Sequence, residues 1–174
     1  MHNIRSSEKK DINALCDLLR NYMKEALSCE WGGSAPIFER DGFGKEFSSV
    51  LAESPNGTII GFGLWRPSYD IHHCISGGEL LELYVKPKYR GQGIALSLIV
   101  FIAKQVQTNG GHYLRGGALS NPQVEHFYDR LAVIFPETMY NIGGRSFRCL
   151  ADLSGKSLRE MISDLPKKSW NYEA

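Results

Sequence analysis

The residues best suited to chemistry lie within 80–96, where an apolar strand, a basic glycine loop and the start of an apolar helix follow one another. Pro87 ends the strand predicted for Leu80–Val85, because proline lacks the N–H that sheet pairing needs. Gly91 and Gly93 follow, and the apolar residues after them recur at the helical spacing of about 3.6. The two glycines therefore lie at the N-terminus of a predicted helix.

This glycine loop has the chemistry of a phosphate or pyrophosphate site. The first turn of a helix has N–H groups without intrahelical partners, and the helix dipole favours negative charge beside them. Lys86, Lys88 and Arg90 add positive charge, and an arginine can bind phosphate oxygens through two hydrogen bonds. The alternative is that Gly91 and Gly93 only shape a tight turn beside a solvated basic rim. The surrounding strand, proline and helix favour a polyanionic ligand.

Two common nucleotide-binding motifs do not fit this spacing. A dinucleotide fingerprint, G-x-G-x-x-G, needs a third glycine where the chain has Leu96, and it follows its strand directly, whereas five residues separate Val85 from Gly91. A Walker loop needs G-x-x-x-x-G-K-[S/T], and Gly155-Lys156-Ser157 has no glycine at the upstream position. The loop therefore belongs to neither class.

The segment resembles the central motif of the GNAT superfamily of acyl-CoA-dependent N-acyltransferases, [L/I]-x-V-x-P-x-[Y/F]-[R/Q]-G-x-G-[I/L]-[A/G]. Downstream, Asn121 and Phe127-Tyr128 are in register with the family's N-x-x-A-x-x-F-Y helix. Upstream, Ile4-Arg5 and Asp11 are similar to its first strand and first-helix start, so the likeness covers roughly residues 2–153. The stretch around the motif also loosely resembles diamine acetyltransferases, which carry paired acids where this chain has Leu81-Glu82.

The resemblance implies the GNAT fold. This is an α/β (α+β) architecture with a central mixed, mostly antiparallel sheet of about six to seven strands, flanked by about four helices and followed here by a C-terminal helix. Residues 1–153 would form this domain, and residues 154–174 a helical extension of it. The extension is expected to pack on its own domain, or alternatively to form the contact of a homodimer.

Local patterns place the individual elements. Alternation and turn residues predict strands at 47–52, 58–65, 80–85, 112–119, 138–140 and 146–152. Helical periodicity and capping residues predict helices behind Ser6 or Ser7, after Pro36, from Ile94, after Asn121, and behind the capping box formed by Ser157 and Glu160.

For the site, the resemblance implies a cradle for acetyl-CoA as co-substrate. Backbone groups of Leu83, Tyr84 and Val85 would hold the pantetheine arm, with the Val85 N–H directed at the thioester oxygen. The residues whose backbone N–H groups would bind the pyrophosphate are Arg90, Gly91, Gln92, Gly93, Ile94 and Ala95. Asn121 would hydrogen-bond the cofactor from the facing helix.

The resemblance also implies direct attack of an amine on the acyl carbon in a ternary complex, with Tyr128 as general acid. A tyrosine of pKa about 10 stays protonated at neutral pH and can donate to the leaving thiolate. Glu82 is the expected general base, directly or through a water. A core aromatic Tyr128 and a solvated or salt-bridged Glu82 are the alternatives. Alternation puts Glu79 on the opposite face from Glu82 unless a bulge intervenes.

The resemblance also implies that the acceptor binds beside Glu30, Trp31, Glu79 and His73. Acidic and aromatic groups there suit a cationic amine such as a polyamine, an aminoglycoside or a lysine side chain. Trp31 covering the sheet is the alternative. We therefore predict an N-acetyltransferase for a primary amine, preferably a small cationic one. The alternatives are a catalytically silent acyl-CoA-binding sensor or interaction module, and acetylation of a protein or aminoacyl-tRNA amine.

Composition adds limits on partners. Lys plus Arg number 20 against 19 Asp plus Glu, which gives no global basic field for nucleic acid. The early residues lack an apolar signal region, and no apolar stretch approaches the roughly 20 residues that span a bilayer, so we expect a cytoplasmic protein without a membrane partner. The four cysteines have no C-x-x-C spacing. They are expected to be buried free thiols, and no metal is expected.

Overall fold

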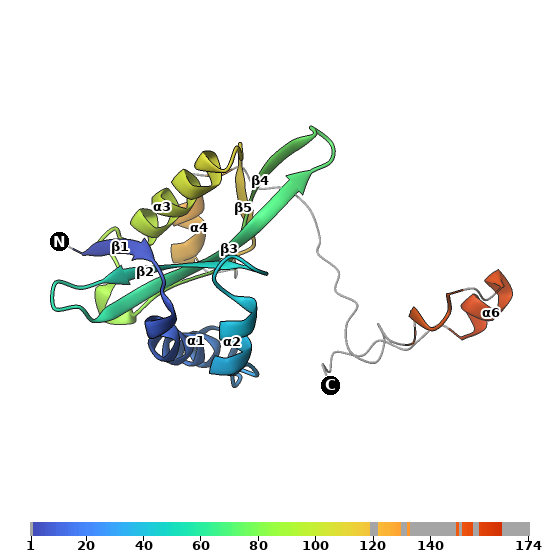
Figure 1. Cartoon of the computed structure of the whole chain (residues 1–174), viewed down its shortest axis with the longest axis horizontal. Helices are drawn as coiled ribbons and strands as arrows, with labels where there is room; N and C mark the ends of the chain where they lie inside the picture. Colours follow the sequence, from blue (N-terminus) through green and yellow to red (C-terminus); the bar gives the residue numbers. More distant parts are fainter. Residues whose placement is uncertain are drawn as a thin grey trace. The chain divides into compact units, whose positions relative to one another are not determined.

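The computed structural model describes residues 2–118, 122–129, 132, 149, 151–154 and 157–164. The chain divides into two compact units, Met1–His126 and Phe127–Ala174, and each is described by itself. The first unit contains the sheet and the long helices (Figure 1). No helix within the described residues combines the length and the apolar character needed to cross a membrane.

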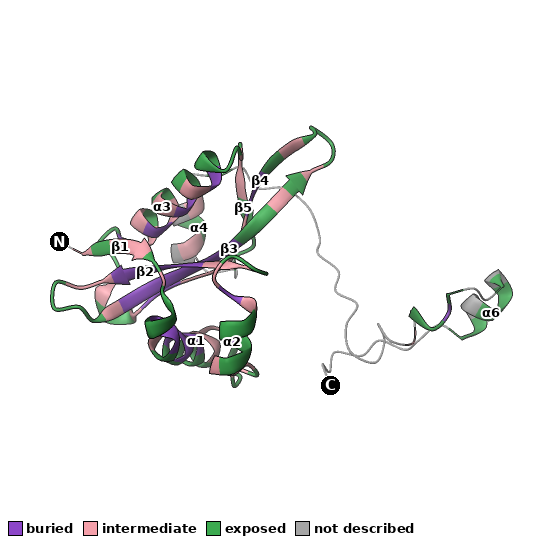
Figure 2. Cartoon of the chain, in the orientation of Figure 1, coloured by how far each residue is buried: buried purple, intermediate pink, exposed green. Residues whose placement is uncertain are grey.

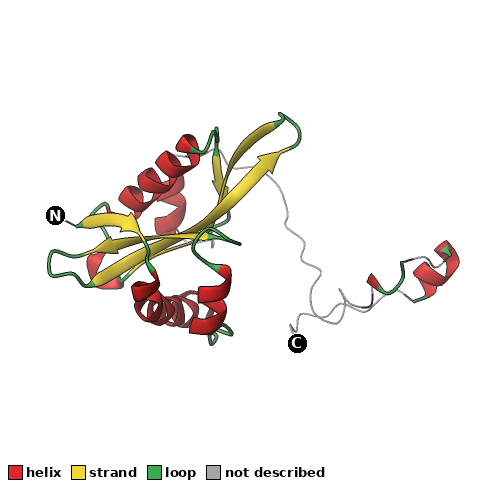
Figure 3. Ribbon diagram, viewed as in Figure 1, coloured by secondary structure: helices red, strands yellow, loops and turns green. Residues whose placement is uncertain are grey.

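A sheet with strand order β1-β2-β3-β4-β5 forms the centre of the first unit (Figure 3). Its strands are β1 (Asn3–Ser6), β2 (Ser48–Glu53), β3 (Ile59–Asp70), β4 (Ile75–Val85) and β5 (Leu114–Gly116). Neighbours pair antiparallel except β4 and β5, which pair parallel. This confirms the mixed, mostly antiparallel sheet predicted from the sequence.

The two further strands predicted near the C-terminus do not add to this sheet in the described part of the chain. Residues 138–140 lie outside the described residues. Within 146–152, Cys149 and Ala151 are helical, so the strand prediction is wrong at these positions. Residues 158–163, where a C-terminal helix was predicted, form α6 (Leu158–Ser163) behind the Ser157 capping box.

Helices cover both faces of the sheet in the first unit (Figure 1). On one face lie α1 (Ile12–Leu27) and α2 (Ala35–Asp41), and on the other lies α3 (Ile94–Thr108). Short 3-10 turns at Lys9–Asp11 and Pro87–Tyr89 precede α1 and the glycine loop. The last helix to begin in this unit is α4 (Pro122–Tyr128), which ends in the second.

Two apolar clusters lie between the sheet and its helices, and the strands between them are the most buried part of the unit (Figure 2). Side chains of β4 alternate between these clusters. Leu80 and Val85 pack in the cluster of α3, whereas Tyr84 packs in the cluster of α1. Because β4 is fixed from both faces, the loop that follows it starts from a rigid position.

The entry into α1 differs from the sequence prediction. Ser6 is the last residue of β1 and Ser7 hydrogen-bonds to β2, so neither caps a helix, and that prediction is wrong. The Glu8 N–H instead donates to the Asp11 carboxylate (2.8 Å) in a reciprocal capping box. Asp11 also accepts from Arg5 at 2.7 Å. The two serines are therefore bonded to the sheet, and Glu8 and Asp11 cap the start of the helical segment instead.

β3 and β4 continue beyond the rest of the sheet as a two-stranded arm. Pairing of β2 with β3 ends at Trp65, and pairing of β5 with β4 begins at Gly78. Within the described residues, Arg66–Asp70 therefore pair only with 75–79 of β4. The Ser76 carbonyl also accepts from the His112 N–H at 2.8 Å. Pro67 is tolerated there because no strand of the described part of the chain pairs with β3 at this outer edge and needs its N–H.

Candidate active site

The glycine loop ends in a helix N-terminus with free backbone donors. The first backbone donor in α3 with an acceptor is Ser97, which bonds the Gly93 carbonyl at 3.0 Å. Within the part of the chain that the structure describes, the N–H groups of residues 91–96 have no protein acceptor. Gly91 (φ 73°) and Gly93 (φ 77°) hold left-handed conformations. A Cβ at either glycine would meet nothing within 4 Å, so the space above the donors is open to an anion.

Both the backbone and the side chain of Arg90 form bonds within the protein. Its backbone N–H donates to the Pro87 carbonyl at 3.1 Å. Its Nε donates to the Val85 carbonyl at 2.8 Å, and its Nη2 lies 2.6 Å from a carboxylate oxygen of Glu25 on α1. Any phosphate contact by Arg90 therefore competes with bonds inside the protein, whereas the donors from Gly91 onward are free.

Among the described residues, no strand pairs with the edge of β4 directly before this loop. Its parallel pairing with β5 covers only Gly78–Leu80. The Lys86 N–H donates to β3, and strand alternation then directs the backbone groups of Tyr84 to β3 as well. The same alternation turns the backbone of Leu83 and Val85 to the open edge. Of the three residues predicted to hold a pantetheine arm, Leu83 thus offers its backbone groups and Val85 its N–H, because the Val85 carbonyl accepts from Arg90. The backbone groups of Tyr84 are used in the sheet.

A bulge in β4 changes which side chains face α1. Two consecutive residues of β3 pair with Leu80 and Glu82, so Leu81 is an extra residue. Leu81 packs against the cluster of α1, and Glu82 also turns to that face, where it meets Tyr22. The bulge thus brings Glu79 and Glu82 to one face, which is the exception that the alternation argument left open.

Glu82 is half-buried, and burial raises the pKa of its carboxyl group. Hydrogen bonding to Tyr22 on α1 offsets part of this rise. No cation of the described residues pairs with Glu82. A desolvated carboxylate without a cationic partner is a stronger base than an exposed one. The contact with Glu82, in addition to burial, raises the pKa of the Tyr22 phenol.

Two other residues predicted for the acceptor site are already paired. Glu79 accepts from Arg66 at 2.8 Å, and the His73 Nδ1 lies 2.8 Å from the Asp70 carboxylate in the turn of the arm. The strand between that turn and Glu82 spans about 20 Å at 3.3 Å per residue. The structure therefore does not bring His73 to Glu82 within one chain.

Trp31 and Glu30 follow α1. Trp31 is half-buried, packs against the α1 cluster, and has the Arg20 guanidinium 5.7 Å from its ring centroid. Glu30 is exposed. The structure records no contact of either residue with Glu82 among the described residues. The packing of Trp31 agrees with the alternative prediction, in which its side chain covers the sheet.

The family model of the acetyltransferase (GNAT) family matches residues 12–132, which include the bulged strand, the glycine loop and α4. This chain belongs to the GNAT acetyltransferase family. The chain is accordingly an N-acetyltransferase, as its motif indicates. The family identity also agrees with the open edge of β4 and the free donors at the start of α3.

Relatives of this GNAT chain include curated enzymes and solved structures. The thialysine N-epsilon-acetyltransferase of Mus musculus is 28% identical over 171 residues, covering 91% of this chain and 95% of that protein. The Bos taurus enzyme of the same name is 30% identical over 122 residues, covering 64% and 71%. The crystal structure of a ribosomal-protein-alanine N-acetyltransferase from Brucella melitensis has a TM-score of 0.64 at 18% identity, covering 82% of this chain and 98% of that one. At that identity the structure supports the fold alone.

Two GNAT motif residues fall beyond the first unit or the described chain. Tyr128 ends α4 in the second unit, is half-buried, and has its pKa raised by burial. Its role stays a prediction. Asn121 lies outside the described residues. Within the described residues, no group of three His, Cys, Asp or Glu side chains is arranged to hold a metal ion. Cys16 is buried, but Cys29 and Cys74 are exposed, so the prediction of buried thiols is wrong for these two.

Sequence reasoning missed two α1 residues that contact the GNAT motif. Tyr22 reaches Glu82, and its ring packs edge-on against Tyr84 with centroids 5.9 Å apart. Glu25 accepts from the Tyr84 hydroxyl at 3.0 Å and pairs with Arg90. Their spacing of three places both on one side of the helix, and this spacing is the signal that could have paired them.

Proposed function

We propose that this enzyme transfers the acetyl group of acetyl-CoA to the primary amine of a small cationic acceptor. The observation that carries the proposal is the pair of free donor sets among the described residues, one at the edge of β4 and one at residues 91–96 before and within the first turn of α3. The backbone groups of Leu83 and the N–H of Val85 fit an extended pantetheine arm, since they can bond to it as a strand would. The open space at Gly91 and Gly93 fits a pyrophosphate.

The chain's own groups then have defined tasks. Acetyl-CoA, when bound, supplies an acyl carbon activated as a thioester. Glu82 accepts a proton from the ammonium group, so that the free amine nitrogen can bond to the acyl carbon while the carbon–sulfur bond breaks. The Val85 N–H polarises the thioester oxygen. Tyr128 donates its proton to the leaving thiolate, and its raised pKa keeps it protonated at neutral pH.

The site fits an acceptor with one cationic group, because it offers one carboxylate without a cationic partner among the described residues. Glu82 has no cationic partner among the described residues, whereas Glu79 is held by Arg66. The residue before Glu82 is Leu81 rather than a second acid, which disfavours polyamines that need paired carboxylates. The curated relatives are named for the ε-nitrogen of thialysine. Thialysine and lysine are therefore the first acceptors to test.

The test measures thiol release from acetyl-CoA with thialysine, lysine, polyamines, aminoglycosides and lysine peptides, and identifies the acetylated product by mass. Calorimetry follows cofactor binding in parallel. We expect turnover with the lysine-like amines, and loss of turnover but not of cofactor binding in Tyr128→Phe. Binding without turnover on any amine would favour the silent acyl-CoA-binding module or a macromolecular acceptor. Absence of acetyl-CoA binding would overturn the proposed function.

A further inference from the structure

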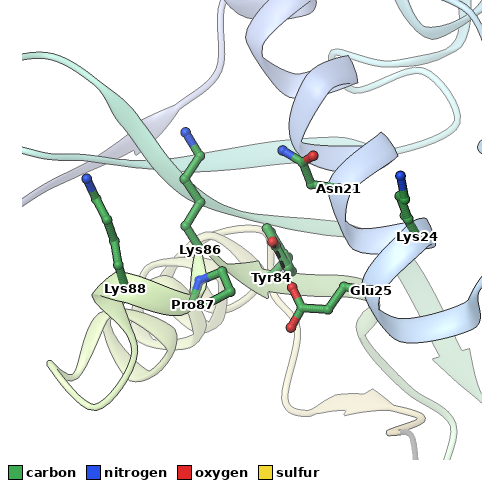
Figure 4. A pocket seen from close by; sticks show the side chains of 7 residues that line it. All are labelled: Asn21, Lys24, Glu25, Tyr84, Lys86, Pro87 and Lys88. Atoms are coloured by element: carbon green, nitrogen blue, oxygen red, sulfur yellow. Dashed lines mark hydrogen bonds between the residues drawn. The ribbon is translucent and has the colours of Figure 1, made fainter.

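A hollow of about 490 Å³ lies between α1 and the segment that follows β4. Its lining residues are Asn21, Lys24, Glu25, Tyr84, Lys86, Pro87 and Lys88. Figure 4 shows Lys86 and Lys88 extending in the same direction from the segment after β4, and Lys24 extending from α1, with Glu25 and Tyr84 between them. We refer to this site as the lysine hollow.

The lysine hollow carries an excess of positive charge. Its single lining carboxylate, Glu25, is already occupied by Arg90 (2.6 Å) and by the Tyr84 hydroxyl (3.0 Å). No carboxylate of the described residues pairs with the three lysines, and the Lys88 ammonium contacts only the ring of Tyr89, at 4.8 Å. Three ammonium groups around one hollow attract an anion and repel a cationic amine. The acceptor is therefore not expected to bind here.

The position of the lysine hollow indicates which anion fits. Lys86 and Lys88 directly precede Arg90, and Glu25 ties Arg90 to the same α1 turn that carries Lys24. The hollow therefore adjoins the glycine loop proposed for the pyrophosphate. In coenzyme A the 3′-phosphate is attached to the ribose whose 5′-oxygen carries the pyrophosphate, so one sugar separates the two anions. A phosphate monoester with a charge near −2 suits lysine ammonium groups.

We propose that the lysine hollow binds the 3′-phosphate of acetyl-CoA through Lys24, Lys86 and Lys88. This inference rests on the proposed function, because it assumes that the pyrophosphate lies at the start of α3. It assigns α1 a direct part in cofactor recognition and makes the affinity for the 3′-phosphate dependent on salt, since the hollow is open to water.

Calorimetry of coenzyme A and 3′-dephospho-coenzyme A tests the inference. The proteins are the full wild-type chain, Lys24→Gln, Lys86→Gln, Lys88→Gln and the triple variant. We expect the wild type to bind coenzyme A about tenfold more tightly, as three partly exposed charge pairs would give. Each single substitution should remove part of this preference and the triple variant all of it. Dephospho-coenzyme A should bind every variant equally.

Lys104→Gln is the matched control, because Lys104 lies on α3 and its ammonium donates to Gln107 outside the lysine hollow. This variant should keep the full preference. Equal wild-type affinity for the two ligands, or a preference retained in the triple variant, would overturn the inference while leaving the proposed function intact. If neither ligand bound to the wild type, the proposed function itself would fail.

Discussion

Two sites, one within the second half of β4 and one in the loop that follows this strand, have opposite charge. The first uses a side chain and the second uses backbone groups. At the upstream site, one extra residue, Leu81, turns the half-buried Glu82 toward α1. At the downstream site, residues 91–96 offer free backbone N–H groups beside three lysines. The first site depends on one side chain with a pKa set by burial, and the second on many donors set by the backbone. In the proposed function, catalysis therefore depends on one side chain, whereas cofactor binding is spread over many backbone groups.

The sharpest test of this division replaces the proposed general base, Glu82. Glu82→Gln should lower kcat by about 10² to 10⁴, because it removes a general base, with no change in the Kd of acetyl-CoA. Steady-state kinetics and calorimetry measure the two effects. Glu79→Gln is the matched control and should lose far less, since Glu79 is already paired with Arg66. Equal losses in the two variants would remove the distinction between these carboxylates.

The downstream site is tested by filling its open space. Gly93→Ala should raise the Kd of acetyl-CoA about tenfold or more, because the methyl group enters the space above the free donors. The left-handed backbone should also cost about 1–2 kcal/mol in stability. Calorimetry and urea unfolding measure these effects.

Gly57→Ala separates backbone strain from ligand contact. Gly57 has φ 80° and open space within 4 Å, like Gly93, but lies in the β2–β3 turn. It should lose similar stability and keep its affinity for acetyl-CoA. A similar loss of affinity in both variants would show that strain, not the cradle, weakens binding.

Tyr22 should tune the upstream site without being essential. Its hydrogen bond lowers the pKa of Glu82, so Tyr22→Phe should raise that pKa further. Because the base must be ionised, the acidic limb of the kcat/KM profile should then move to higher pH, by about one unit or less. Tyr69→Phe, on the exposed arm, should leave the limb in place. A limb that stayed put or moved to lower pH in Tyr22→Phe would contradict this role.

The smallest effect is expected from Arg66→Gln. This substitution breaks an ion pair whose arginine side chain is 53% exposed, so stability should fall by less than about 1 kcal/mol. The KM for the amine should change little, because Glu82 rather than Glu79 is proposed to face it. A large fall in KM would mean that the freed Glu79 binds the acceptor, and the upstream site would then contain two working carboxylates.

The sequence predicts best those elements whose boundaries depend on local chemistry. The start of α3 at Ile94 follows from the glycines before it and is confirmed, as is the strand leading to Pro87. The arm at Arg66–Asp70 was missed because its strands are stabilised by pairing with each other rather than by an apolar pattern. The capping role given to Ser6 was wrong because a strand more than forty residues away pairs with it.

Contacts between residues far apart in the sequence could not be predicted from local sequence patterns. Glu25 and Tyr84 are separated by 59 positions, so nothing near either residue predicts their hydrogen bond. Tyr22 fits the amphipathic pattern of α1, which hides its polar contact with Glu82. The bulge at Leu81 has no glycine or proline to mark it, and alternation alone would have separated Glu79 from Glu82.

The run of free main-chain donors from Gly91 to Leu96 also bears on how this enzyme can diverge. A main-chain N–H is present whatever side chain stands at Gln92 or Leu96, and only proline removes it. The strict demand is the left-handed backbone at the two glycines. Surface substitutions can therefore accumulate over the cradle without loss of the cofactor. If the acceptor binds at Glu82 as proposed, its side of the site can change while the binding of the acyl donor is kept.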